Sequence, residues 1–163
     1  MRSSSPPSPL VFDDPHFRIA SSGPVVVARW LAAPTAGDIQ RMRAVLRPFV
    51  SRFDAFCSLN VVDIAHASSP MPDDARREVA STQREFESRQ RGLANVIEGE
   101  GFWAASLRSV ASGLAFMSRV KFEQRIFDAL DPAARWLGTL MPPQAVDVAD
   151  VIRVGARLRG EPG

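Results

Sequence analysis

Apolar residues along the chain occur in short runs that alternate with stretches of helical spacing. Two strand-like runs, at residues 17–20 and 25–31, flank the sequence SSGP, whose turn-forming residues predict a β-hairpin. Apolar residues at helical spacing between residues 38 and 53 then predict a helix, with Thr35 as its N-cap and an Arg-rich opposite face. Pro48 lies inside this pattern, so the helix should kink or end a first segment there.

The rest of the chain keeps the same alternation. The apolar run AFCSLNVVDIAHA, residues 55–67, predicts a strand that is buried on both faces. Early acidic residues and a thin apolar stripe predict a solvated helix at 73–90. We therefore expect an α/β fold: one domain with a mixed, largely parallel sheet of about five strands and helices packed on it. The remaining expected elements are a strand at 92–99, a helix at 102–119, a strand around 125–127 and a helix at 131–141.

The two ends of the chain differ in composition from its centre. Residues 1–14 are rich in Ser and Pro and lack the apolar core of a signal peptide, so they predict a disordered arm. Residues 142–163 hold one weakly helical stretch, 146–158, and predict a tail that is partly helical and frays. The expected folded domain is 15–141, and both ends should be dispensable for folding.

Three segments of the sequence resemble parts of one protein family. LNVVDIAHASSPMPDDARREVA is similar to a buried strand that ends in Asp, a loop, and a helix opening with Pro, acidic residues, Ala and Arg. GLANVIEGEGFWAASLRSVASGLAFM is similar to the next strand and helix, and RIFDALDPAARWL to the closing strand and helix. Over about residues 17–140 the chain resembles the STAS-like family, in its bacterial branch labelled SpoIIAA-like or STAS/SEC14-like.

The resemblance implies a STAS-like fold and a non-catalytic regulatory or scaffolding domain that binds another protein. In anti-sigma-factor antagonists of this fold, the helix after the buried strand carries a phosphorylatable Ser in an Asp-Ser-Gly setting. Ser68 and Ser69 stand at the corresponding place, but Pro70 follows them and no Gly does. Whether either serine is phosphorylated is left open.

Candidate chemistry gathers after the 55–67 strand. Asp63, His66, Ser68 and Ser69 lie near its carboxyl end, where open α/β sheets usually bind ligands. They predict either a partner-binding site or an ordinary loop in which Asp63 caps a turn. If Asp63 is such a cap, Asp63→Ala should lower the free energy of unfolding by about 1 kcal/mol. A Ser-His-Asp triad is rejected because no nucleophile-elbow glycines flank either serine.

Catalysis, metals and cofactors have no further support in the sequence. His16 and His66 are the only histidines, and the single cysteine, Cys57, falls inside an expected strand as a small buried residue. No glycine-rich phosphate loop is present. We therefore predict a protein that is not an enzyme and that uses neither a cofactor nor a metal.

The stretch GFWAASLRSVASGLAFMSR, residues 101–119, is unusually apolar for one helix. Its two apolar stripes cover more than half of the helix circumference, and Arg108 shares the remaining face with serines. Both stripes are buried, or else Trp103, Phe116 and Met117 stay partly open as a groove for a partner protein. The alternative function is a module for a small apolar ligand or lipid, with the 102–117 helix as one wall.

The net charge and the length of the apolar stretches argue against nucleic acid and a membrane as partners. The 20 basic and 18 acidic residues leave a formal charge of +2, too small for a strong phosphate-binding field, so no nucleic acid is expected. No apolar stretch is long enough to span a bilayer. One cysteine cannot form an internal disulfide, which favours the cytoplasm. A homodimer is left open, and Trp136 is expected to be buried while Trp103 is partly exposed.

Overall fold

The computed structural model describes residues 9–63, 71–98, 101, 104–106, 108–109, 111–113 and 119–160 of the chain. The described strands form one six-stranded sheet in which each strand lies beside its neighbour in sequence, in the order β1-β2-β3-β4-β5-β6. The strands are β1 (Val11–Asp13), β2 (Phe17–Ser22), β3 (Val25–Trp30), β4 (Phe56–Val62), β5 (Gln90–Ile97) and β6 (Glu123–Phe127). The helices are α1 (Ala36–Val50), α2 (Asp73–Phe86), α4 (Leu130–Thr139) and α5 (Val148–Leu158).

The sheet is mixed and mostly parallel. β1, β2 and β3 pair antiparallel, whereas β3 to β6 are all parallel. The α/β class expected from the sequence is therefore confirmed. The sheet has one strand more than expected because β1 pairs with β2, with Val11 opposite Ala20.

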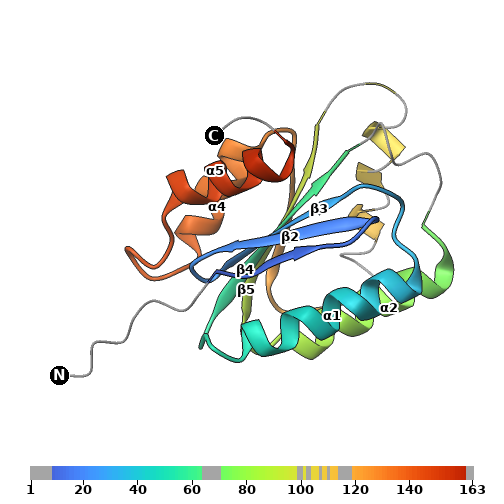
Figure 1. The fold of residues 1–163 in the computed structure, drawn as a ribbon, viewed down its shortest axis with the longest axis horizontal. Coiled ribbons are helices and arrows are strands. Elements are labelled where there is room, and N and C mark those ends of the chain that lie inside the picture. Colours follow the sequence, from blue (N-terminus) through green and yellow to red (C-terminus); the bar gives the residue numbers. More distant parts are fainter. Residues whose placement is uncertain are drawn as a thin grey trace.

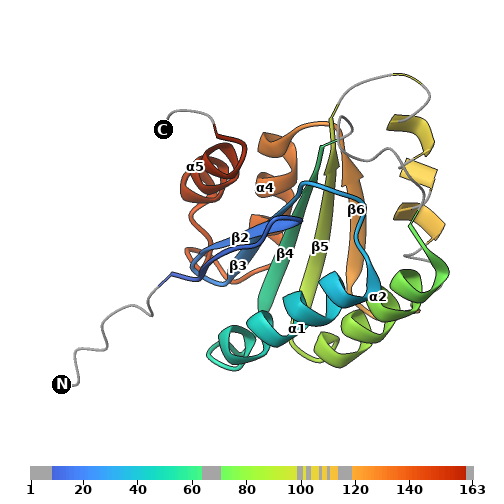
Figure 2. The ribbon, with the colours of Figure 1, turned by 45° about the vertical axis from the view of Figure 1, so that its right-hand side comes forward.

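Helices cover both faces of this sheet. α1 and α2 lie side by side on one face, and α4 and α5 cover the other (Figures 1 and 2). Each strand alternates its side chains between the two covers, so Leu59 and Val61 of β4 face α4 and α5. Phe56 on the same strand belongs to the cluster under α1.

α1 begins where the sequence predicted. The Thr35 hydroxyl accepts a hydrogen bond from the Asp38 amide at 3.1 Å, and the Asp38 carboxylate accepts one from the Thr35 amide at 2.9 Å. This reciprocal capping box satisfies two backbone donors at the helix start. The helix then continues through Pro48 to Val50, so the proline does not end it.

The face under α4 and α5 is tightly packed. Trp136 is buried against Phe127, with ring centroids 5.5 Å apart, as expected for the closing helix. A Cβ placed on Gly155 of α5 would lie 2.6 Å from Leu130 Cδ2, so α4 and α5 approach each other at that glycine. This side of the domain has the dense packing of an ordinary apolar core.

The expected boundaries of the folded part need correction at both ends. β1 lies inside the stretch expected to be a disordered arm, and α5 lies inside the expected tail. α5 packs because Val151 and Val154 are buried in the core below it. The Asp147 carboxylate caps its first turn by accepting from the Asp150 amide at 3.0 Å. Deleting the residues after 142 would therefore expose core, contrary to the expectation from composition.

Two further expectations concern helices. Residues 104–106, 108–109 and 111–113 are helical, in agreement with the helix expected there. Among the described residues, no helix combines the length and apolar content needed to cross a membrane.

Truncating a core leucine should destabilise the protein strongly. Leu59 is fully buried under α4 and α5, so Leu59→Ala should lower the free energy of unfolding by about 2–5 kcal/mol. The control is Val11→Ala in β1, because that side chain is 74% exposed and should change the free energy by no more than about 0.5 kcal/mol. Urea denaturation followed by circular dichroism measures both. Equal losses in the two variants would contradict this packing.

Candidate ligand-binding cavity

A cavity of about 200 Å³ lies between the sheet and the α1–α2 cover. Most of its walls are apolar side chains from both helices and from three strands. Ala111, in the stretch expected to form a wall, also lines it. The apolar lining consists of Val26, Ala28, Trp30, Ala32, Ala33, Pro34, Ile39, Met42, Leu46, Val62, Met71, Val79, Phe86, Leu93, Ile97 and Ala111.

The floor of the cavity carries polar side chains from the three parallel strands β4, β5 and β6. Ser58 and Asn60 of β4, Asn95 of β5 and Gln124 of β6 all line it. Asn60 and Asn95 are directly opposite each other in the register of β4 and β5. The Asn60 Nδ2 donates to Asn95 Oδ1 at 3.1 Å, so a cross-strand amide pair lies under the cavity.

The polar floor follows from alternation along β4. Cys57, Leu59 and Val61 point to the tightly packed face and are apolar, whereas Ser58 and Asn60 point to the cavity. Amide and hydroxyl groups need hydrogen-bond partners when they are buried. Gln124 has one in α2, because Gln83 Nε2 donates to its Oε1 at 3.4 Å. The space between floor and cover is therefore lined by polar groups of the sheet and of α2 as well as by apolar side chains.

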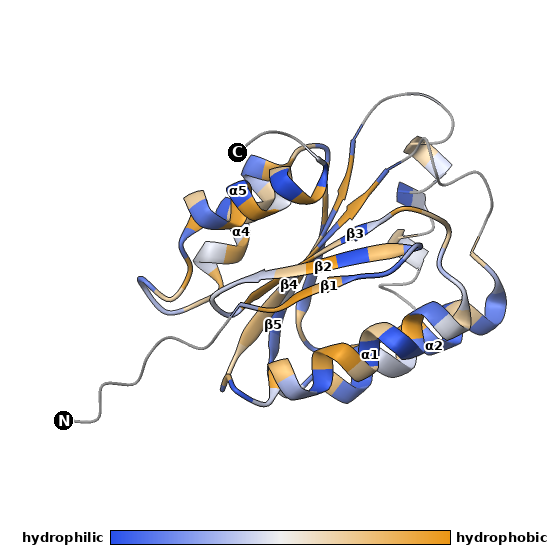
Figure 3. Cartoon of the chain, viewed as in Figure 1, coloured by the Kyte–Doolittle hydropathy of each residue, from blue (hydrophilic) through white to orange (hydrophobic). Residues whose placement is uncertain are grey.

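The roof of the cavity is held together by charged contacts between α1 and α2. Arg43 pairs with Glu78 and donates to the Thr82 hydroxyl at 3.0 Å. One turn later Arg47 pairs with Glu85 at 2.6 Å, and this guanidinium lowers the pKa of the Glu85 carboxyl. Figure 3 shows hydrophilic residues on both helices beside the apolar stripe of α1. The two helices are thus joined by ion pairs as one cover.

Ion pairs also lie at the carboxyl ends of the parallel strands. Asp63, directly after β4, lines the cavity and pairs with Arg29 of β3 at 3.1 Å. Arg29 also donates to the Leu158 carbonyl of α5 at 2.8 Å. Arg108 donates to the Ile97 carbonyl at the end of β5 at 3.2 Å. Asp63 therefore serves as an ion-pair partner of a neighbouring strand.

The structure locates two of the partner-binding residues expected from the sequence. Asp63 and Arg108 both lie near the carboxyl ends of β4 and β5, as described above. The amide pair was missed, although polar residues at alternate positions of an expected buried strand are a visible signal. The other expected residues, His66, Ser68, Ser69, Trp103, Phe116 and Met117, lie outside the described residues.

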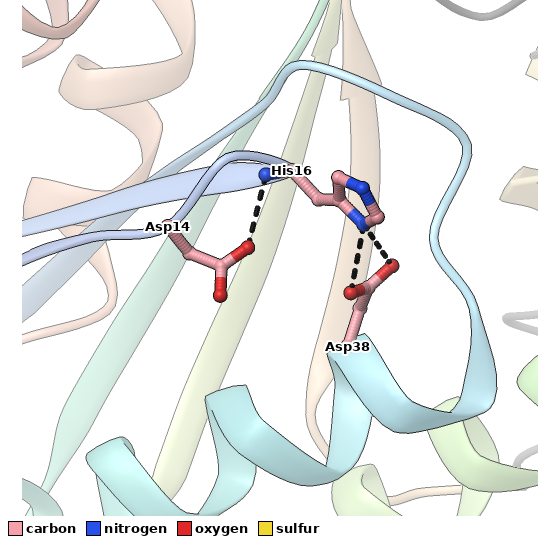
Figure 4. A group of neighbouring side chains, drawn as sticks. All are labelled: Asp14, His16 and Asp38. Carbon is pink, nitrogen blue, oxygen red and sulfur yellow. Dashed lines mark hydrogen bonds and ion pairs between the residues drawn. The ribbon is translucent and has the colours of Figure 1, made fainter.

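A second cluster, Asp14, His16 and Asp38, offers possible metal-ligand atoms within 4.8 Å of one another (Figure 4). The His16 Nδ1 lies 3.0 Å from an Asp38 oxygen. The Arg41 guanidinium donates to both carboxylates, at 3.1 Å to Asp14 Oδ2 and 2.5 Å to Asp38 Oδ1. These carboxylates already hold a cationic side chain, so the cluster is better explained as a structural link between the β1–β2 connection and α1.

Cys57 has no environment for reactivity. It is fully buried, and burial raises the pKa of its thiol to about 11. A thiol with so high a pKa is a poor nucleophile at neutral pH. The expectation of a small buried residue is confirmed.

Comparisons with protein-family models, curated proteins and solved structures found no match to this chain. The STAS-like assignment therefore stays a prediction from the sequence. The class that the structure supports is a single-sheet α/β protein with a partly polar cavity between the sheet and the α1–α2 cover.

The contacts between α1 and α2 should contribute to stability. The Arg43 side chain is only 15% exposed, so Arg43→Met should lower the free energy of unfolding by about 1–2 kcal/mol by leaving Glu78 and Glu85 without this partner. The control Arg135→Met breaks an ion pair with Asp131 whose arginine is 69% exposed, and its effect should be much smaller. Urea midpoints compare the two. A larger loss at Arg135 would contradict the account of the roof.

Stability should fall in acid partly through Asp38. Burial acts to raise the pKa of this carboxyl, but hydrogen bonds from Thr35 and His16 outweigh it and hold the pKa below its ordinary value of 3.8. Because the pKa of Asp38 is lower in the folded protein than in the unfolded chain, the ionised carboxylate stabilises the fold at pH values above the unfolded pKa. This stabilisation is lost as the pH falls through the folded pKa. The difference in unfolding free energy between wild type and Asp38→Asn should thus shrink below pH 3.8.

Denaturant titrations at a series of pH values check this, with Asp54→Asn at an exposed position as the control. A difference that stays constant with pH would exclude a role for the ionised carboxylate. Some acid sensitivity should remain in Asp38→Asn, because the pKa values of Asp14 and Glu85 are lowered as well.

Proposed function

We propose that this protein is a binding module for a small apolar ligand, held in the cavity between the sheet and the α1–α2 cover. The carrying observation is the cavity itself, about 200 Å³ in volume with mostly apolar walls. Apolar cavities of about 150 Å³ stay dry and bind benzene. The size therefore suits a molecule of one aromatic ring with a short substituent, or an aliphatic chain of similar volume.

The walls support this proposal by their chemistry. Ile39, Met42 and Leu46 form a continuous apolar stripe on α1, and Val79 and Phe86 extend it on α2. Removing apolar ligand surface from water contributes about 25 cal/mol per Å² buried. Met42 is unbranched and adaptable, which suits a wall that closes around different shapes.

The charged roof supports it in a second way. α1 and α2 contact each other closely, while α4 and α5 approach the strands more closely than α1 and α2 do. The ion pairs join the two helices to each other, in addition to the apolar cluster through which both pack on the sheet. The cavity can then persist without the dense apolar packing found on the opposite face.

Binding of another protein, as the family resemblance implies, stays a second proposal. It rests on the sequence, and most of the surface residues expected to carry it lie outside the described part of the chain. The prediction that the protein is not an enzyme likewise stays a prediction. The ligand-binding role is preferred because it rests on a described cavity.

Filling the cavity should abolish ligand binding without harming the fold. Ala28 lines the cavity from β3, so Ala28→Leu should occupy part of it and leave the free energy of unfolding unchanged or slightly raised. Ethylbenzene should raise the melting temperature of the wild type and not that of Ala28→Leu, because a ligand stabilises only the form that binds it.

Ala94→Leu is the matched control, since Ala94 is fully buried on the opposite face of the sheet. This variant should lose about 1–3 kcal/mol through overpacking and still bind ethylbenzene. Two results would contradict the proposal: no binding of ethylbenzene by the wild type, or equal binding by Ala28→Leu. Calorimetry and melting curves measure both quantities.

A further inference from the structure

The two asparagines in the floor of the cavity keep hydrogen-bonding groups that their mutual bond does not use. Among the described residues, the Asn60–Asn95 hydrogen bond is the single side-chain hydrogen bond that either asparagine makes. It uses one N–H of Asn60 and the carbonyl of Asn95. The Asn60 carbonyl and the Asn95 amino group keep hydrogen-bonding capacity. Exchanging the nitrogen and oxygen of both amides leaves the same two kinds of group available, so the conclusion does not depend on that assignment.

Both asparagines line the cavity, and both side chains are only partly buried. The pair therefore has one acceptor and one donor left for the polar end of a molecule bound beside it.

The charge of the described part of the lining favours a neutral ligand over an anionic one. Among the described residues that line the cavity, Asp63 is the one charged side chain, and it is an acid already paired with Arg29. A buried carboxylate is best offset by a cation. The described lining offers neutral hydroxyl and amide donors but no cation, and its one charged side chain is itself an acid, so a neutral polar end is favoured over a carboxylate.

We infer that the ligand is a neutral, mostly apolar molecule whose polar end both donates and accepts hydrogen bonds, such as a hydroxyl or a primary amide. The Asn60–Asn95 pair recognises this end by hydrogen bonding to it. The inference rests on the proposed function, because it needs the cavity to hold a ligand. Asn60 and Asn95 then determine specificity, and the apolar walls supply most of the affinity. A single hydroxyl can accept from the amino group and donate to the carbonyl at once.

Two matched pairs of probes test this inference by calorimetry at neutral pH. Benzyl alcohol and ethylbenzene share their shape and differ in one hydroxyl, and phenylacetamide and phenylacetate differ in charge. Wild type should bind phenylacetamide at least about tenfold more tightly than phenylacetate. The ratio of benzyl alcohol affinity to ethylbenzene affinity should fall about tenfold in Asn60→Leu/Asn95→Leu, which removes both amides at similar side-chain volume.

Gln40→Leu is the control variant. It removes a side-chain amide in the same way, but Gln40 is exposed on α1 and does not line the cavity, so this variant should keep the wild-type ratio. An unchanged ratio in the double variant, or tighter binding of phenylacetate than of phenylacetamide by the wild type, overturns the inference and leaves the proposed function standing. Failure of every probe, ethylbenzene included, overturns the proposed function itself. The phenylacetamide comparison uses wild type alone, so it decides even if the double variant does not fold.

Discussion

A parallel sheet must be covered on both of its faces, and in this protein both covers pack apolar side chains on the sheet. Under α4 and α5, Leu59, Val61 and Trp136 belong to one buried cluster. α1 and α2 have a second cluster on the other face and are in addition joined to each other by arginine–carboxylate pairs, led by Arg43 with Glu78. The two covers therefore differ in the charged contacts that join α1 to α2.

The cavity lies between the sheet and the α1–α2 cover. The face of the sheet under α1 and α2 carries the Asn60–Asn95 pair where a core would carry leucine or valine. Partly buried amides that keep hydrogen-bonding capacity can bond to water or to a ligand. A ligand with a matching polar end would satisfy them and cover the apolar walls in the same step. On this account the densely packed face under α4 and α5 supplies stability, and the face under α1 and α2 supplies specificity for the ligand.

Much of the architecture could be predicted from the sequence, because periodicity reports directly on strands and helices. The Thr35 cap, the buried strand around Leu59 and the burial of Trp136 all follow from such local signals. β1 was missed because composition suggested a solvated end. The helix expected at 146–158 is present as α5, but it was placed outside the folded domain, whereas Val151 is buried by contacts distant in sequence. Pro48 was expected to kink the helix or to end a first segment, and α1 continues through it to Val50, because a proline near the end of a helix disturbs few hydrogen bonds.

The site was harder to predict than the fold. Asp63 was expected as a site residue from its place at the end of a strand, but its partner Arg29 is remote in sequence. Asn60 and Asn95 stand 35 residues apart, and only the register of β4 against β5 brings them together. Pairing of this kind depends on strand order and register, which one sequence does not specify.

The most direct measurement is a nitrogen–proton NMR titration of the side-chain amides with benzyl alcohol. The chain holds two asparagines, Asn60 and Asn95, so their amide signals can be assigned with single substitutions. The account predicts that both signals shift saturably while the side-chain amide of the exposed Gln144 does not. Binding of benzyl alcohol that leaves both asparagine signals unmoved would contradict the claim that this pair forms the floor of a ligand site.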